Sequence, residues 1–347
     1  MRERFKQPSR LAAAVFILLG IFIFADARVN AQTNFYDGKA IRMIVGFTPG
    51  GGYDAYTRTL GRHIGKHIPG NPVIIVENMP GAGSMISANY VFKAAKPDGL
   101  TIGHFIGGLF LQQLLAKPGI EFDAAKFHYV GVPAQDNFVI GIAKATGIAD
   151  IESWLASKQV VKFGGVASGS GSDDIPNVLK VTLGLPIQLV SGYKGTADVR
   201  LAFNSGEVAG LSNSWESTKS TWRKELETGE LKLVLQVTLK PHPEFLKLPM
   251  ALNYAKTDEA KRLISTVARV HGATVRPYVL PPNTPADRVQ IIRKAFMDTM
   301  KDPDFLAEAK KANLDINPAD GAELEQSVKE ILKLEPALVA KLKEILK

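Results

Sequence analysis

Three turns rich in glycine and serine have the residue types best suited to chemistry in this sequence, and that chemistry is the binding of an anion. They are Thr48 to Tyr53, Gly81 to Ser84 and Ser168 to Ser172. Each follows an apolar stretch and precedes a helical pattern. Each is therefore expected to present free backbone N–H groups and the positive end of a helix dipole. One such turn alone is explained equally well as a tight connection, but three in one chain favour a cleft that binds a carboxylate.

The turns do not match the motifs of common enzymes. GFTPGGGYD lacks the Gly-Lys-Ser/Thr ending of a phosphate-binding loop, and GAGSMISA carries Ile86 where a dinucleotide fingerprint needs glycine or alanine. No serine lies in the G-x-S-x-G pattern of a hydrolase nucleophile. We therefore expect no cofactor and no catalysis. The enzyme alternative is a hydrolase or isomerase that uses Asp54 with Ser84 or Lys194.

The histidine and acidic residues do not indicate a metal site. His63 and His67 are four residues apart on an expected helix, but HIGKH lacks the glutamate of the zinc-protease motif. Asp173 and Asp174 are adjacent at a helix start, so they point in different directions and suit capping better than acid–base catalysis. The chain has no cysteine, which excludes thiol chemistry and cysteine-ligated metals.

Strands that alternate with helices must position the first two turns. Apolar runs without alternation, typical of buried parallel strands, occupy residues 41–47, 73–76 and 100–106. After the first run, apolar residues at four-residue spacing predict a helix from about Ala55, with Asp54 at its N-cap. This alternation predicts a doubly wound α/β sheet, whose ligands bind at the carboxyl ends of the strands.

A second region of the same kind follows and contains the third turn. Its expected strands are 138–143, 160–165 and 187–190, with a short helix at 150–157 and another from Ala197. From Val275 the sequence is proline-rich and extended, and the tail after it is helical. We therefore predict two α/β lobes, the first made from both ends of the chain. The expected divisions are lobe 1 at 32–139 and 256–347, and lobe 2 at 140–255.

Residues 1–31 have the pattern of a signal peptide. Four basic residues precede an apolar run at 11–25, and small residues follow up to Ala31. The run is shorter than the roughly 20 residues that span a bilayer, so we expect cleavage after Ala31 rather than a permanent anchor. The mature protein is then expected to be soluble outside the cytoplasmic membrane.

The net charge does not indicate a nucleic-acid partner. The formal charge is +8 for the full chain, and after residue 31 it falls to +5, from 37 basic and 32 acidic side chains. Lysines of the C-terminal helices alternate with glutamates, as at Lys329 and Glu330, which makes solvated faces. No basic stripe is interleaved with aromatic residues, so we expect no nucleic-acid binding.

Five stretches together resemble the extracytoplasmic solute receptors of the tripartite tricarboxylate transporters, the Bug or TctC proteins. Their order and spacing agree over most of the chain after residue 31. The most specific pieces are VENMPGAG and the early strand followed by PGG and an aspartate. The stretches are IRMIVGFTPGGGYDAYTR, VIIVENMPGAGSMISANYVFKAAKPDGLTI, VKFGGVASGSGS, YKGTADVRLAFNSGEV and PYVLPPNTPADRVQIIRKAF.

The resemblance implies a periplasmic binding protein of the second structural type, with two α/β lobes and a ligand cleft between them. It implies a monomeric, non-enzymatic receptor in the periplasm. Such a receptor binds a small organic carboxylate, largely through backbone amides and bridging waters, and delivers it to membrane permease subunits. A periplasmic sensor that feeds a signalling kinase stays open as an alternative.

The resemblance also assigns ligand contacts residue by residue. The first-lobe loops correspond to Phe47, Thr48, Pro49, Gly50, Gly51, Gly52, Tyr53 and Asp54, and to Gly81, Ala82, Gly83 and Ser84. The second-lobe turns correspond to Ser168, Gly169, Ser170, Gly171 and Ser172, to Tyr193, Lys194 and Gly195, and to Asn213.

Residues 213–265 depart from the family pattern, which leaves the identity of the ligand open. Within this segment, Trp215 is expected either to wall the ligand together with Tyr53 or to belong to the core. Lys194, in the second-lobe turn, either pairs with a distal carboxylate or is a solvated surface residue.

Overall fold

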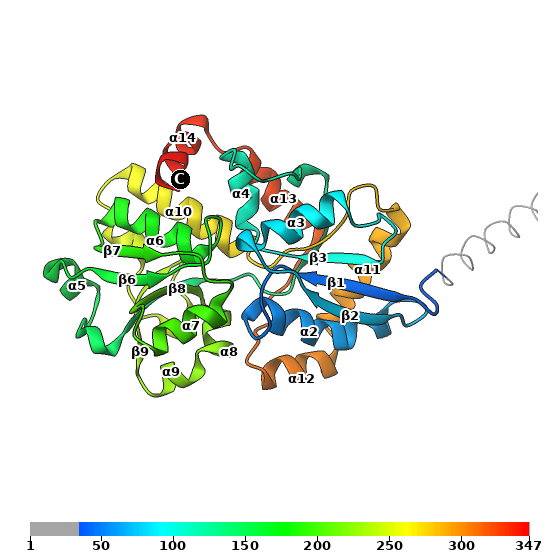
Figure 1. The fold of residues 1–347 in the computed structure, drawn as a ribbon, viewed down its shortest axis with the longest axis horizontal. Coiled ribbons are helices and arrows are strands. Elements are labelled where there is room, and N and C mark those ends of the chain that lie inside the picture. Colours follow the sequence, from blue (N-terminus) through cyan, green and yellow to red (C-terminus); the bar gives the residue numbers. More distant parts are fainter. Residues whose placement is uncertain (1–34, 347) are drawn as a thin grey trace, which may run out of the picture.

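The computed structural model of the protein describes residues 35–346, so the predicted signal peptide and its cleavage site lie outside the described residues. The strands form two separate sheets, one in each of two lobes (Figure 1). This arrangement confirms the predicted two-lobed α/β fold. Among residues 35–346, no helix combines the length and the apolar character needed to cross a bilayer.

Strands from both ends of the described chain form the first sheet. They are β1 (Ala40–Val45), β2 (Val73–Asn78), β3 (Thr101–His104), β4 (His128–Val132), β10 (Tyr278–Leu280) and β11 (Ala319–Asp320). Their order is β11-β4-β10-β3-β1-β2. β1 pairs in parallel with β2 and β3, whereas β10 and β11 form antiparallel pairs.

Both faces of the first sheet carry apolar side chains, and successive residues of a strand point to opposite faces. Ile41 and Met43 of β1 join one core cluster, and Ile44 joins the other. Helices cover both faces (Figure 1). Those on the first face are α2 (Gly52–Ile64), α11 (Ala286–Thr299) and, beside α2, α12 (Pro303–Lys311); those on the second are α3 (Met85–Lys93), α4 (Gly108–Leu114) and α13 (Gly321–Leu332).

The second sheet has five strands in a mixed arrangement. They are β5 (Phe138–Ala143), β6 (Val161–Gly164), β7 (Ile187–Val190), β8 (Gly210–Ser214) and β9 (Leu231–Val237). Their order is β7-β6-β8-β5-β9, with β6 parallel to β7 and β8, and β5 antiparallel to β8 and β9. The helices around it are α5 (Ile151–Ser157), α6 (Gly171–Leu183), α7 (Thr196–Asn204), α8 (Trp215–Thr221), α9 (Arg223–Glu227) and α10 (Asp258–Ala273) (Figure 1).

The chain crosses between the lobes after β4 and again after α10, so its C-terminal part returns to the first sheet. The last helix, α14 (Pro336–Ile345), contacts α6, and α10 packs against α6 as well. The predicted lobe boundaries stay a prediction. Because α10 and α14 both contact α6, we propose that the second lobe extends through residue 273 and is covered by the last helix.

The predicted apolar strands agree with the structure to within a few residues. The run at 187–190 coincides with β7, and the run at 41–47 appears as β1 two residues shorter at its end. Short 3-10 turns connect several elements. They are Gly65–His67, Ala82–Ser84, Ala124–Lys126, Lys144–Thr146, Pro243–Phe245 and Ala251–Tyr254.

Candidate functional site

A cavity of about 50 Å³ lies where the two lobes meet. Predicted ligand-binding residues from both lobes line it, together with residues that the sequence reasoning missed. The predicted ones are Phe47, Thr48, Gly51, Gly52, Tyr53, Ser170, Gly171, Ser172, Gly195 and Asn213. The additional ones are Ile106, Phe138, Val166 and Thr196.

The first lobe brings the N-terminus of α2 to this cavity. The helix begins at Gly52, and its N-cap residue Gly51 has extended backbone and makes no side-chain capping hydrogen bond. The first N–H groups of a helix have no carbonyl partner within it. The backbone N–H groups of Gly52 and Tyr53, two lining residues, therefore donate no hydrogen bond to a capping side chain.

Asp54 lies in the first turn of α2, so its predicted place at the N-cap is wrong. The glycines before it allow the helix to begin earlier, and its carboxylate turns back to accept the N–H of Gly50 at 3.0 Å. Burial alone raises the pKa of Asp54. The hydrogen bonds from Arg58, Asn78 and Gly50 outweigh that effect and lower the pKa. Asp54 thus binds its own loop and does not line the cavity.

The second lobe contributes the N-terminus of α6, the third predicted turn. Its N-cap residue Ser170 has extended backbone but makes no side-chain capping hydrogen bond. The Ser170 hydroxyl lies instead 2.6 Å from the carbonyl oxygen of Ala167 and 2.9 Å from the carboxylate of Asp173. As in α2, the leading N–H groups, here those of Gly171 and Ser172, adjoin the cavity without a side-chain cap.

The N-terminus of α7, also in the second lobe, faces α2 across the gap between the lobes. Its N-cap residue is Gly195, again without a side-chain cap, and Thr196 is its first helical residue. A Cβ atom on Gly195 would lie 3.0 Å from Oγ1 of Thr48. A Cβ atom on Gly51 would lie 3.3 Å from Oγ1 of Thr196. The two helix starts therefore approach each other as closely as glycine allows.

Three helix N-termini without side-chain caps thus converge on one cavity. Each contributes the equivalent of about half a positive charge. Each helix also carries an acidic residue in its first turn, Asp54 in α2, Asp173 and Asp174 in α6, and Asp198 in α7. Burial raises the pKa of Asp173. The arrangement suits a compact anion, and the first-turn acids moderate the positive potential.

A buried hydroxyl beside the cavity lacks a hydrogen-bond partner. Oγ1 of Thr48 is enclosed and makes no hydrogen bond to any of residues 35–346. A buried polar atom without a partner costs free energy, so such atoms are usually satisfied by water or a ligand. Thr48 is therefore placed to bond a group inside the cavity.

Apart from the helix starts, Thr48 and Asn213, the cavity wall is apolar, and its aromatic rings are firmly held. The Phe47 and Tyr53 rings lie 4.5 Å apart between centroids. The Tyr53 hydroxyl donates to the carbonyl oxygen of Val275, so the ring is fixed to the segment between α10 and β10 that returns from the second lobe. Behind Tyr53 lies His104, whose pKa burial lowers to about 3, so this imidazole is neutral.

A buried ion pair stands where the chain passes between the lobes. The Arg276 guanidinium donates to the carboxylate of Asp136, and both side chains are at most 1% exposed. Arg276 also donates to the Ser214 hydroxyl at 2.7 Å and lies over the ring of Tyr56. Both terminal nitrogens of the guanidinium are thus bonded to protein groups, and Arg276 serves to position the segments around the cavity.

The second predicted turn, Gly81–Ser84, is not among the cavity lining. It packs against the other lobe instead, since a Cβ atom on Gly83 would lie 2.6 Å from Cβ of Ala167. The hydroxyl of Ser84 accepts the N–H of Ile106 at 3.0 Å. This turn therefore supports the lobe contact and the cavity wall at Ile106.

Other predicted residues also lie outside the lining. Lys194 is exposed, and Tyr193 directs its hydroxyl to the Glu207 carboxylate at 2.6 Å. Trp215 is half-buried and packs edge-to-face on Phe245, with ring centroids 5.1 Å apart. The remaining predicted positions outside the lining are Pro49, Gly50, Asp54, Gly81, Ala82, Gly83, Ser84, Ser168 and Gly169.

Sequence reasoning missed four lining residues, for a physical reason. Ile106, Phe138 and Val166 are apolar residues at strand ends, and nothing local separates them from core residues. Thr196 follows the predicted turn at Gly195 directly, so extending that turn by one residue finds it.

The two histidines four residues apart on α2 and just after it pair with carboxylates on α12 and at its start. His63 lies 2.6 Å from Glu308, and His67 lies 2.9 Å from Asp302. Within residues 35–346, no three His, Asp or Glu side chains are grouped so that they could hold a metal ion.

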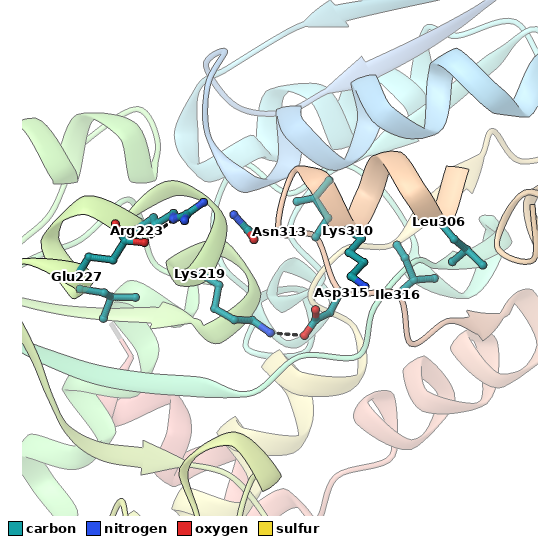
Figure 2. A pocket seen from close by; sticks show the side chains of 10 residues that line it. Lys219, Arg223, Glu227, Leu306, Lys310, Asn313, Asp315 and Ile316 are labelled. Carbon is teal, nitrogen blue, oxygen red and sulfur yellow. Dashed lines mark hydrogen bonds and ion pairs between the residues drawn. The ribbon is translucent and has the colours of Figure 1, made fainter. Parts of the chain in front are cut away.

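A wider groove of about 600 Å³ lies between α8 and α9 on one lobe and α12 and the segment after it on the other (Figure 2). Two of its three cations, Lys219 and Arg223, have carboxylate partners, and Lys310 has none among residues 35–346. Lys219 bonds Asp315 across the lobes and Glu244 at 2.8 Å, and Arg223 bonds Glu227 at 2.6 Å. The groove contains none of the predicted ligand residues, so we assign the site to the smaller cavity.

The chain was compared with known families and proteins. The profile of the tripartite tricarboxylate transporter family receptor matches residues 57–343. The UPF0065 protein in the gbd 5' region of Cupriavidus necator is 24% identical over 346 residues, which cover 98% of each chain.

Solved structures of periplasmic binding proteins share the fold. The periplasmic binding protein BugD has a TM-score of 0.73 at 21% identity, covering 90% of this chain and 100% of that one. An R. palustris protein solved with adipate has a TM-score of 0.70 at 20% identity, covering 89% and 98%. MatC from Rhodopseudomonas palustris with bound malate has a TM-score of 0.68 at 18% identity, covering 89% and 99%.

Proposed function

The chain belongs to the tripartite tricarboxylate transporter receptor family, and from this premise we propose that it binds a small organic carboxylate outside the cytoplasmic membrane. The bound receptor delivers that acid to the permease subunits of such a transporter. The ligand site is the cavity between the lobes, and the function is transport, without turnover of the acid.

One observation carries this proposal, the convergence of three uncapped helix N-termini from two lobes. α2 comes from the first lobe, and α6 and α7 come from the second. Because the anion bridges N–H groups on both lobes, its binding stabilises the closed arrangement over an open one. That coupling between binding and closure is what a delivering receptor requires.

Two further observations support a carboxylate. Structural neighbours with the same fold were solved with adipate and with malate, which are organic acids. The unpartnered hydroxyl of Thr48 supplies an additional hydrogen bond beside the helix starts. Asp54 and Ser84, the residues of the enzyme alternative, have hydrogen-bond partners within the first lobe and lie outside the cavity lining.

Thermal unfolding in the presence of aliphatic mono- and dicarboxylates tests the proposal. An acid at about 100 times its dissociation constant should add roughly 2.7 kcal/mol to the free energy of unfolding. The matched control is the neutral amide of each acid, which should add nothing because it lacks the charge that the helix dipoles favour. The proposal fails if no acid stabilises the protein, or if the amides stabilise it equally.

A further inference from the structure

We propose that Lys219 forms a clasp between the lobes, an ion pair with Asp315 that favours the closed arrangement before any acid binds. Lys219 lies on α8 of the second lobe, outside the cavity lining. Its ammonium bonds the carboxylate of Asp315, in the segment after α12 of the first lobe (Figure 2). The inference rests on the proposed function, in which closure accompanies binding of the acid, but its test requires no acid.

The side chain of Lys219 is held in place by its own lobe. Its ammonium lies 2.8 Å from the carboxylate of Glu244 and 3.4 Å from that of Glu216. It also lies over the ring of Trp215, 5.5 Å from the centroid. A side chain that is already fixed loses little further rotamer freedom when the lobes close, so this entropic cost offsets little of its attraction to Asp315.

Asp315 is fixed to the first lobe in turn. The hydroxyl of Tyr56, on α2, donates to the backbone carbonyl oxygen of Asp315 at 2.8 Å. Tyr56 is buried, and so is Leu314, which precedes Asp315 in the chain. The backbone at Asp315 is therefore expected to move with α2 when the lobes separate.

The helices α2 and α8 link the clasp to the cavity. Gly52, at the start of α2, lines the cavity, and a Cβ atom on it would lie 2.8 Å from Oγ of Ser217 on α8. Tyr56 comes four residues after Gly52, and Lys219 comes two residues after Ser217. A separation of the lobes that opens the cavity at α2 therefore also draws Lys219 away from Asp315.

The charges around Lys219 favour the closed arrangement. An isolated ion pair at the surface contributes little, because water and salt screen it. The side chain of Lys219 is only 17% exposed, and its ammonium contacts three carboxylates rather than one. Without it, the carboxylates of Asp315 and Glu244 would lose the cation that they share across the lobes, and their repulsion would favour opening.

Distance measurements between two spin labels on the ligand-free mature protein test the clasp. Because the chain has no cysteine, labels can be attached at Val73→Cys on β2 and Leu201→Cys on α7, each 66% exposed and on different lobes. In this labelled background, Lys219→Met should lower the ratio of closed to open molecules at least about fivefold. Equal distance distributions with and without Lys219→Met overturn the inference. Failure of every acid to stabilise the protein against thermal unfolding would overturn the proposed function alone.

Three further variants separate the clasp from a general effect of charge or folding. Lys224→Met removes an exposed positive charge from α9 of the same lobe and should leave the ratio unchanged. Asp315→Asn alone changes a side chain that is 50% exposed, so the fold should tolerate it, and it should lower the ratio about threefold. In the Lys219→Met background, Asp315→Asn removes the carboxylate that repels Glu244 and should restore part of the closed population. An equal fall in Lys224→Met, no fall in Asp315→Asn alone, or no recovery in the double variant, would contradict the clasp.

Discussion

Gly52→Ala should weaken ligand binding while leaving the ligand-free protein folded. Gly52 is the first residue of α2, and its backbone is helical, so alanine fits its conformation. The new Cβ atom would lie 2.8 Å from Oγ and 3.0 Å from Cβ of Ser217, on α8 of the other lobe. The clash arises only between the lobes, so it opposes closure and not folding.

The size of the effect follows from these distances. Carbon atoms in ordinary contact are about 3.5–4.0 Å apart, so the lobes must separate by roughly 0.5–1 Å at this point. A hydrogen bond of about 2.9 Å that spans the lobes then lengthens beyond hydrogen-bonding range. Loss of one hydrogen bond to a charged group costs about 1.5–3 kcal/mol, which corresponds to a roughly 10- to 100-fold higher dissociation constant.

The assay is calorimetric titration with the tightest-binding acid, accompanied by thermal unfolding of the ligand-free variant. Gly61→Ala is the matched control, because its methyl group, on the same helix, meets only Ile74, Val76 and Met43 of the first lobe. Ser217→Gly in the Gly52→Ala background removes the clashing atoms and should restore most of the affinity. Unchanged affinity in Gly52→Ala, or an equal loss in Gly61→Ala, would refute this reasoning.

Three further substitutions probe other groups. Thr48→Val removes the unpartnered hydroxyl and should weaken acid binding roughly 3- to 10-fold without lowering the unfolding temperature of the ligand-free protein. An unchanged dissociation constant would show that Thr48 makes no hydrogen bond to the ligand. Arg276→Met leaves the carboxylate of Asp136 buried without its partner and should lower the urea-unfolding free energy by about 3–5 kcal/mol; a loss below about 1 kcal/mol would contradict the buried pair. Burial and the charge of Asp136 raise the pKa of Glu216 from 4.5 to about 8, so the folded state holds a proton there. The protonated Glu216 contributes fully to the free energy of unfolding below pH 4.5, and this contribution, up to about 4 kcal/mol, is lost as the pH rises to about 8. Glu216→Gln should therefore remove this pH dependence of the unfolding free energy, measured by denaturant titration. A pH dependence identical to that of the wild type would contradict the raised pKa.

The strands and the chemistry of the turns were predictable because both are local. Apolar runs such as 187–190 identify buried strands by composition alone, and glycine before a helical pattern indicates a free helix start. The residues at Gly51, Gly52 and Gly171 were found in this way and line the cavity. The predicted start of α2, at about Ala55, is three residues late. Aspartate is a common N-cap residue, which favours a start after Asp54, whereas the glycines allow the helix to begin at Gly52.

Which residues line the cavity was harder to predict, because this depends on how the two lobes meet. Gly81–Ser84 is rich in glycine like the lining turns, yet Gly83 packs against Ala167 and the turn stays outside. Phe138 and Val166 are distant in sequence from the first lobe, and only lobe packing brings them beside Phe47. Local residue patterns carry no information on such contacts.

A crystal structure of the protein with its tightest-binding acid tests the central claim most directly. The account predicts one carboxylate whose oxygens lie about 2.7–3.2 Å from N–H groups at the starts of α2, α6 and α7. A carboxylate held by charged side chains, for example beside Lys219 and Arg223 in the wider groove, would contradict it.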